Sequence, residues 1–306
     1  MKRFSNYQYV GGEMSDRDKK EQGSKFWNDG KWNNFVLPFL PDDVSEMTLI
    51  DIGCNAGVFL KLAEDKGFQN VIGVDADKES YKKAIKYRKE NGGKYRYIYK
   101  DMRNCINDIP MSDYIVMAMT HYYFDIPQWL KFMDNIHAKT ANIIIVTASK
   151  REKISRAGSD TERIREYFKN WKETGYIPQP PLEGDPFPRK QWSFCFRSPT
   201  IDRFPIDKLD IGNHVQDGLY QDIDDGKDIF RSRYFRILKE YRRKKWSKER
   251  LVKFMEGKKA TYQSVKENGL LEPIIINDNN RVVDGNHRAN MMQHLGYKSV
   301  LVRRVK

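Results

Sequence analysis

The sequence predicts an α/β protein in which a mostly parallel sheet carries helices on both faces, followed by a small α+β domain. Three observations lead to this prediction. Residues 47–75 read as a strand, a glycine loop, a helix and a second strand, the order of a right-handed βαβ unit. Similar short apolar runs recur up to residue 147, and a separate strand and helix pattern occupies residues 251–306.

Length and composition restrict the class of protein. The chain has 306 residues, enough for two domains, and 55 Lys and Arg against 42 Asp and Glu give a net charge of +13. This surplus favours anionic partners without naming one. No apolar run is long enough to cross a bilayer, and the first ten residues lack the apolar core of a secretory signal. We expect a cytoplasmic protein with no membrane association, and the isolated cysteines predict neither disulfides nor a metal site.

The first βαβ unit is defined by its apolar spacing. Residues 47–52 are typical of a buried parallel strand, 58–66 have helical spacing that Gly67 ends, and 70–74 form the next strand. Ligands bind at the carboxyl ends of such strands. We therefore expect a site in the loop between residues 52 and 58.

Three more strands and a hairpin extend this sheet. The strands are predicted at 94–100, 113–119 and 142–147, with an amphipathic helix at 126–137. Downstream, GYIPQPPLEG and QWSFCFRS are aromatic and β-branched, and the proline-rich DPFPRK joins them. They indicate an antiparallel hairpin.

The glycine loop disfavours a dinucleotide. Gly53 and Gly57 enclose Cys, Asn and Ala, so that Asn55 stands where a dinucleotide fold places the glycine that admits a pyrophosphate. Asp75, at the end of the next strand, is placed to accept hydrogen bonds from two ribose hydroxyls. A nucleoside that carries an amino-acid tail fits both features.

These residues resemble a known family. DIGCNAG, VIGVDAD and the later YKDM are similar to the motifs of class I S-adenosylmethionine (SAM)-dependent methyltransferases, across residues 47–150 and, with the hairpin, to about residue 200. The resemblance implies a Rossmann-like sheet and SAM as cofactor. It places the loop against the methionine part of SAM, Asp51 near its amino group, Asp75 at the ribose and Asp101 at the adenine. The implied cofactor-binding residues are Asp51, Gly53, Cys54, Asn55, Ala56, Gly57, Asp75, Ala76, Asp101 and Met102.

The segment THYYF after the fourth strand bears on the chemistry. His121 is a candidate base, with pocket lining as the more conservative interpretation, and Tyr122 is the second catalytic candidate. The aromatic residues face the cationic methyl group or fill the core, and for Phe124 we expect core packing. The segment matches neither the Asp/Asn-Pro-Pro-aromatic run of amino-methylating DNA enzymes nor the Pro-Cys nucleophile of cytosine methylases. An oxygen or nitrogen nucleophile of a small, sugar-type or phosphorylated acceptor remains.

The N-terminal segment suggests a helical cover. Trp27, Lys31 and Trp32 lie about one helical turn apart ahead of the first strand. Lys31 and Trp32 are candidates for contact with an acceptor phosphate or the SAM carboxylate. The simpler interpretation has the tryptophans packed on the sheet and Lys31 in solvent.

The composition changes after residue 206. Residues 207–228 are acidic and linker-like, whereas residues 229–253 hold 11 Lys and Arg against two Glu, with apolar residues on one helix face. Such a helix suits nucleic acid or an acidic surface, but the charged outer face of an interdomain helix is the usual explanation.

The C-terminal segment resembles the ParB/sulfiredoxin-like domain through GLLEPIII and VVDGNHRAN. The helix start in DGNHR exposes backbone N–H groups, which favours a phosphate cradle. Its residues are Asp284, Gly285, Asn286, His287 and Arg288. Because DGNHR holds no cysteine, sulfinate reduction is excluded. A small-molecule kinase that uses ATP or CTP with magnesium stays open, with Glu272 or Asp284 as its carboxylate, and so does a purely structural role in which Asp284 caps the helix.

We therefore predict a methyltransferase domain at 1–206, a linker and basic helix at 207–250, and a ParB-like domain at 251–306. The leading function is SAM-dependent methylation of a small or phosphorylated acceptor, with a phosphate- or nucleotide-binding module. The alternatives are a bifunctional methyltransferase and kinase, and a nucleic-acid-associated protein.

Overall fold

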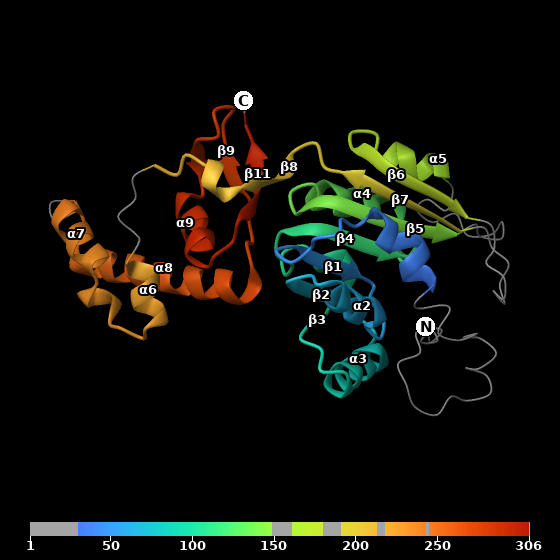
Figure 1. Cartoon of the computed structure of the whole chain (residues 1–306), viewed down its shortest axis with the longest axis horizontal. Helices are drawn as coiled ribbons and strands as arrows, with labels where there is room; N and C mark the ends of the chain where they lie inside the picture. The colour runs from blue at the N-terminus through green and yellow to red at the C-terminus, as the bar shows by residue number, and fades with distance from the viewer. Residues whose placement is uncertain (1–29, 149–160, 180–190, 213–217, 243–244, 306) are drawn as a thin grey trace. The chain divides into compact units, whose positions relative to one another are not determined.

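The computed structural model describes residues 30–148, 161–179, 191–212, 218–242 and 245–305. The chain divides between Ile201 and Asp202 into two compact units, each with its own sheet (Figure 1). In the described residues, no helix is both long and apolar enough to cross a membrane.

The sheet of the first unit has seven strands in the order β3-β2-β1-β4-β5-β7-β6. The strands are β1 Thr48–Ile52, β2 Asn70–Asp75, β3 Arg96–Tyr99, β4 Ser112–Ala118, β5 Thr140–Ala148, β6 Lys172–Gln179 and β7 Gln191–Arg197. The first five are parallel, and β7 runs antiparallel to both of its neighbours. The predicted strands and closing hairpin are thus confirmed, whereas the DPFPRK loop lies outside the described residues.

Helices cover both faces of this sheet. They are η2 Trp32–Val36, α2 Val58–Lys66, α3 Lys78–Glu90, α4 Ile126–Ile136 and α5 Thr161–Tyr167. Alternation along β1 sends Leu49 into the core that contains Trp32 and Phe59, and Ile50 into the core that contains Trp129 of α4. Every residue of β1 is buried, as expected of a central parallel strand covered on both faces.

The sheet of the second unit has four strands in the order β10-β9-β11-β8. The strands are β8 Ile201–Pro205, β9 Ile274–Ile276, β10 Val282–Asp284 and β11 Ser299–Arg304, and the helices are α6 Leu219–Asp224, α7 Arg233–Arg242, α8 Lys248–Asn268 and α9 Asn286–His294. Strand β10 is antiparallel to β9, and β11 is parallel to it. The strands and helix expected between residues 273 and 305 are present.

The structure differs from the predicted linker. Strand β8 begins the second sheet, where Arg203 Nη1 donates to the Ser299 carbonyl at 3.2 Å, so the second unit begins earlier than residue 207. The predicted basic helix over 229–253 is broken because two serine side chains start new helices. Ser232 Oγ accepts from the Phe235 N–H at 3.1 Å ahead of α7, and Ser247 Oγ accepts from the Arg250 N–H at 3.2 Å at α8.

Candidate active site at the carboxyl edge of the first sheet

The loop between β1 and α2 requires glycine at its first position. Gly53 has φ of 79°, in the left-handed region. A Cβ atom there would lie 2.2 Å from Cγ2 of Thr120, whose hydroxyl donates to the Ile52 carbonyl at 3.0 Å. Thr120, which lies just after β4 and which the sequence analysis missed, thus packs directly against Gly53 of the loop.

Asn55 fixes the middle of the loop. Its N–H donates to Asp75 Oδ2 at 2.9 Å, and its side-chain Oδ1 accepts from the Ala56 N–H at 2.7 Å. The Tyr97 hydroxyl on β3 donates to the Asn55 carbonyl at 3.0 Å. These bonds hold Asn55 at φ of 50°, a conformation that asparagine tolerates. Tyr97 was also missed, since its role comes from the neighbouring strand.

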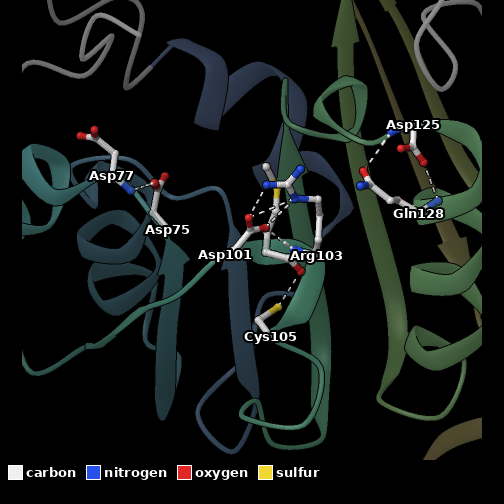
Figure 2. Close-up of polar contacts among 8 residues, drawn as sticks. Asp75, Asp77, Asp101, Arg103, Cys105, Asp125 and Gln128 are labelled. Carbon is white, nitrogen blue, oxygen red and sulfur yellow. Dashed lines mark hydrogen bonds and ion pairs between the residues drawn. The ribbon is translucent and has the colours of Figure 1, made fainter. Parts of the chain in front are cut away.

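Asp75 at the end of β2 connects the loop with α3. Besides the Asn55 N–H on Oδ2, its Oδ1 accepts from the Asp77 N–H at 2.8 Å (Figure 2). Burial raises the pKa of Asp75 above its ordinary value, while the hydrogen bonds from Asp77 and Asn55 oppose the rise. A carboxylate oxygen accepts more than one hydrogen bond, so Asp75 retains the capacity to receive hydroxyl donors.

Asp51 is the more deeply buried carboxyl group. Its side chain belongs to β1 and is 2% exposed. Burial and then the nearby charge of Asp75 raise its pKa to about 8. The same burial, with the charges of Asp51 and Asp75, raises the pKa of the Cys54 thiol well above its ordinary value. In the described chain, no ion pair joins Asp51 or Asp75 to a cation, so this edge holds uncompensated acidic groups.

Asp101 and Met102 follow β3 on the other side of Asp75. The Asp101 carboxylate accepts from Nε of Arg103 at 2.9 Å, which lowers the pKa of Asp101. Figure 2 shows the Asp101 and Arg103 side chains directed at one another. Met102 packs against the core, and its carbonyl accepts from Cys105 Sγ at 3.2 Å. Arg103 is a third residue that sequence patterns did not indicate.

The segment after β4 is more buried than a surface base would be. His121 begins the short helix η5 His121–Tyr123 and is 2% exposed. Its Nε2 lies 3.2 Å from Thr147 Oγ1, and its ring centroid is 6.2 Å from that of Trp129. This placement favours the pocket-lining interpretation of His121. Phe124 is fully buried against Trp129, which confirms core packing, and the Tyr122 side chain lies outside the described residues.

The residues ahead of β1 that were candidates for acceptor contact differ in burial. Trp32 is 3% exposed, and its ring lies 5.5 Å from that of Phe59 on α2. Lys31 precedes η2 and is half-buried. Trp27 lies outside the described residues. Trp32 therefore acts as a core residue, in the cluster that also contains Cys54 of the loop.

In the second unit, DGNHR forms the start of α9. Gly285 has φ of 91° and precedes the helix. Arg288 donates to Glu272 at 2.6 Å and to Asp284 at 2.8 Å, so two carboxylates already neutralise its charge. This arrangement is less favourable for an incoming phosphate than the open cradle that the sequence suggested.

Comparison with known proteins identifies similarities in the first unit. A family described as methyltransferase domain matches residues 26–179. Ubiquinone biosynthesis O-methyltransferase of Rickettsia felis is 25% identical over 160 residues, which cover 46% of this chain and 65% of the relative. The Rickettsia conorii enzyme of the same name is 25% identical over 114 residues, 37% and 39% of the two chains. The chain thus spans less than two thirds of these relatives.

Solved structures with a similar arrangement include a SAM-dependent methyltransferase from Archaeoglobus fulgidus, at 13% identity and a TM-score of 0.47, which covers 59% of this chain and 97% of the other. Magnesium protoporphyrin IX methyltransferase from Synechocystis, with bound SAM, has 13% identity and a TM-score of 0.46, and covers 61% and 86%.

Proposed function

Because the chain belongs to the family of SAM-dependent methyltransferases, we propose that it transfers a methyl group from SAM to an oxygen or nitrogen nucleophile of a small acceptor. The observation that carries the proposal is the pair of carboxyl groups formed by the buried Asp51 and the half-buried Asp75, which form no ion pair with a cation among the described residues. SAM carries an ammonium and a sulfonium against one carboxylate, so it brings the positive charge that this edge lacks. The O-methyltransferase relatives favour oxygen as the methylated atom.

The residues fit the parts of SAM in the order of the strands. Asp51, beneath the loop, would hold the ammonium group. Asp75 would accept hydrogen bonds from the ribose hydroxyls, with Ala76 beside it. Met102 would offer an apolar contact to the adenine, and Asp101, oriented by Arg103, would accept from its amino group. The loop from Gly53 to Gly57 would pack against the methionine part.

When bound, SAM supplies a methyl group that its sulfonium makes electrophilic. The contribution of the chain is orientation, since in-line displacement requires that the acceptor atom be held at the methyl carbon. The loop is suited to this task because Asp75 of β2 and Tyr97 of β3 hydrogen-bond its backbone, and Thr120, after β4, donates to Ile52 where the loop begins. His121 stays a candidate base, although its burial favours a role in shaping the pocket floor.

Calorimetry with the whole chain tests this proposal. We expect SAM and its demethylated product to bind, and NAD not to bind, because Asn55 occupies the position where a pyrophosphate requires glycine. Binding of NAD together with failure to bind SAM at millimolar concentration would overturn the proposal.

The role of His121 is tested separately by its pH profile. In His121→Gln, loss of a base would remove a titration from the rate of methyl transfer. A structural role would lower the rate equally at every pH.

For the second unit, the further proposal is a ParB-like module that binds phosphate or nucleotide, or phosphorylates the acceptor. It is supported by the strand, turn, strand, helix and strand order between residues 273 and 305, and by the glycine that starts α9. Glu272 and Asp284, the two carboxylates that pair with Arg288, oppose simple anion binding. The same two residues are the candidates for the catalytic carboxylate that a kinase requires. Turnover of ATP or CTP with magnesium, lost in Arg288→Ala, would support the kinase. Failure of either nucleotide to bind would remove both forms of this proposal.

A further inference from the structure

A row of alternating cations and aromatic rings runs from the end of α7 along α8. Its members recur at every fourth residue. Arg242 ends α7, Trp246 lies just before the Ser247 cap of α8, and Arg250, Phe254 and Lys258 share one face of α8. We call Arg242, Trp246, Arg250, Phe254 and Lys258 the cation–aromatic row.

The contacts within the row are ring contacts. The guanidinium carbons of Arg242 and Arg250 lie 5.0 and 4.8 Å from the centroid of the Trp246 ring. The Phe254 ring packs edge-on against Trp246 at 5.1 Å. Lys258 Nζ lies 5.1 Å from the Phe254 centroid. Each cation therefore leans on an aromatic face.

Among the described residues, none of the three cations of the row pairs with a carboxylate, and Arg242 Nε is buried without a hydrogen-bond acceptor. Two lysines elsewhere in the second unit differ. Lys227 pairs with Asp225 at 2.8 Å and Lys266 with Asp224 at 2.8 Å. Arg242 and Arg250 thus carry positive charge that no carboxylate of the described residues neutralises, whereas Lys258 is 7% exposed and forms the buried end of the row.

Stacking leaves the binding capacity of arginine intact. A guanidinium that lies over a ring uses its face, while its N–H groups point outward in the plane and match the oxygens of a phosphate. The surrounding sequence reinforces the field, because residues 229–253 hold 11 Lys and Arg against two Glu.

The extent of the basic segment indicates a polymeric anion. Arg242 and Arg250 belong to residues 229–253, which hold 11 Lys and Arg against two Glu, so one phosphate group cannot neutralise the charge of this segment. A nucleic-acid strand supplies a charge about every 3.4 Å. Tyr241, beside Arg242, is 75% exposed, and the Arg242 guanidinium lies 5.0 Å from its ring. An exposed ring next to cations suits an unstacked base, which single strands offer and duplexes do not.

We propose that the cation–aromatic row, together with Tyr241, binds single-stranded nucleic acid through its phosphates and one stacked base. DNA and RNA share this chemistry. The proposal goes beyond methyl transfer and does not depend on it, because the row lies entirely in the second unit.

Fluorescence anisotropy of the whole chain with labelled oligo(dT) and oligo(U) of about 20 nucleotides tests the proposal. For Arg242→Gln/Arg250→Gln we expect about tenfold weaker binding and a smaller dependence on salt. The slope of log K against log salt should fall by about 1.4, since each phosphate contact with a single strand contributes about 0.7. A preference for oligo(U) or oligo(dT) then identifies the natural strand.

The matched control removes two positive charges that have carboxylate partners. Lys227 pairs with Asp225, and Arg231 lies 3.6 Å from Asp228. Lys227→Gln/Arg231→Gln should change affinity by less than about twofold, because exposed pairs of this kind contribute little. An equal loss in the two double variants would overturn the proposal, since net charge alone would then explain binding.

Two further variants separate charge from stacking. Arg242→Lys/Arg250→Lys keeps the charge and should preserve the salt slope while it weakens binding, because lysine lacks the planar fork. It also keeps the test decisive if the glutamine variant does not fold, as judged by circular dichroism. Tyr241→Ala should weaken binding about fivefold with no change in slope.

Three other outcomes would also overturn the proposal. They are no binding of either oligonucleotide at about 50 mM salt, duplex DNA bound as tightly as the single strands, and binding to phosphatidylserine vesicles in place of oligonucleotides.

Discussion

The carboxyl edge of the first sheet and the cation–aromatic row of the second unit both contain charged groups without partners of opposite charge. The two regions differ in the sign of that charge. At the edge, Asp51 is buried and Asp75 half-buried, and no cation of the described residues forms an ion pair with either. In the row, Arg242 and Arg250 lie on Trp246, and within the part of the chain that the structure describes no carboxylate pairs with them. Burial of an uncompensated charge, as at Asp51, costs free energy of folding.

The difference between the two regions is the sign and the depth of the charge. The edge is buried and acidic, which suits a small cationic ligand enclosed by the loop. The row is basic and continues into the exposed Tyr241, which suits an extended anion. Charge that the fold leaves uncompensated thus indicates the charge of the partner.

The largest expected effect is on the acidic edge. Asp75→Ala removes the acceptor for both ribose hydroxyls and the anchor of the Asn55 N–H. Two hydrogen bonds to a charged group are worth about 4 kcal/mol together, or close to a thousandfold in the dissociation constant of SAM. Calorimetry measures the loss. Asp77→Ala, which removes only the cap of α3, should stay within a few fold, and an equal loss there would contradict the assignment.

The second prediction concerns the cost of burying Asp51. Its pKa rises from 3.8 to about 8 in the folded chain. Below pH 4 the Asp51 carboxyl group is protonated in both the folded and the unfolded chain. Between pH 4 and 8 it ionises in the unfolded chain but not in the folded chain, so the free energy of unfolding falls as pH rises. Asp51→Asn should remove this fall and stabilise the first unit by about 3 kcal/mol at pH 8, roughly half of the full shift at 1.4 kcal/mol per unit.

Unfolding in urea from pH 5 to 9 measures this effect. The control is Asp65→Asn, because the Asp65 side chain is 57% exposed and pairs with Lys61 on its own helix. A variant of Asp51 that loses stability at pH 8 would show that the carboxylate is compensated in the folded chain.

The basic row should respond to pH in the opposite sense. Lys258 is 7% exposed, and burial lowers its pKa from 10.5 to about 7. The folded chain therefore disfavours the proton, and the cost is complete below pH 7 and absent above pH 10.5. Lys258→Met should stabilise the second unit by about 2 kcal/mol at pH 6, with the gain vanishing at high pH. Lys259→Met, an exposed neighbour, is the control, and equal gains would contradict the prediction.

The sequence predicted the sheet well and some helices poorly, for a physical reason. Strands β1 to β5 are buried in apolar runs, so composition alone locates them. Helix α3 buries little more than Ser80 and Ala84, so its charged sequence shows no apolar stripe. The acidic segment after residue 207 read as a linker, yet Leu219 and Tyr220 of α6 are buried. Its aspartates act as caps and ion-pair partners, functions that composition does not distinguish from solvation.

Some residues of the candidate site could be located from the sequence, and others could not. Spacing along the chain located Asp51, Asp75 and the loop at one edge, because the ends of neighbouring parallel strands must meet there. Thr120 and Tyr97 contact the loop only because β4 and β3 lie near it in the sheet. Such contacts depend on strand order. Arg103 donates a hydrogen bond to Asp101, and the sequence does not specify the side-chain conformations that allow this bond.

The smallest expected effect distinguishes paired from unpaired cations within the second unit. Arg288 is 16% exposed, but its partners Glu272 and Asp284 are 75% and 67% exposed. Exposed carboxylates are readily solvated, so Arg288→Gln should destabilise the unit by no more than about 1 kcal/mol. It should also leave oligonucleotide affinity within about twofold, since the lost charge was already neutralised. Urea unfolding and anisotropy measure the two quantities on one sample. A tenfold loss of affinity would mean that pairing with carboxylates does not decide which cations of this unit meet an anionic partner, and the contrast between Arg288 and the row would no longer hold.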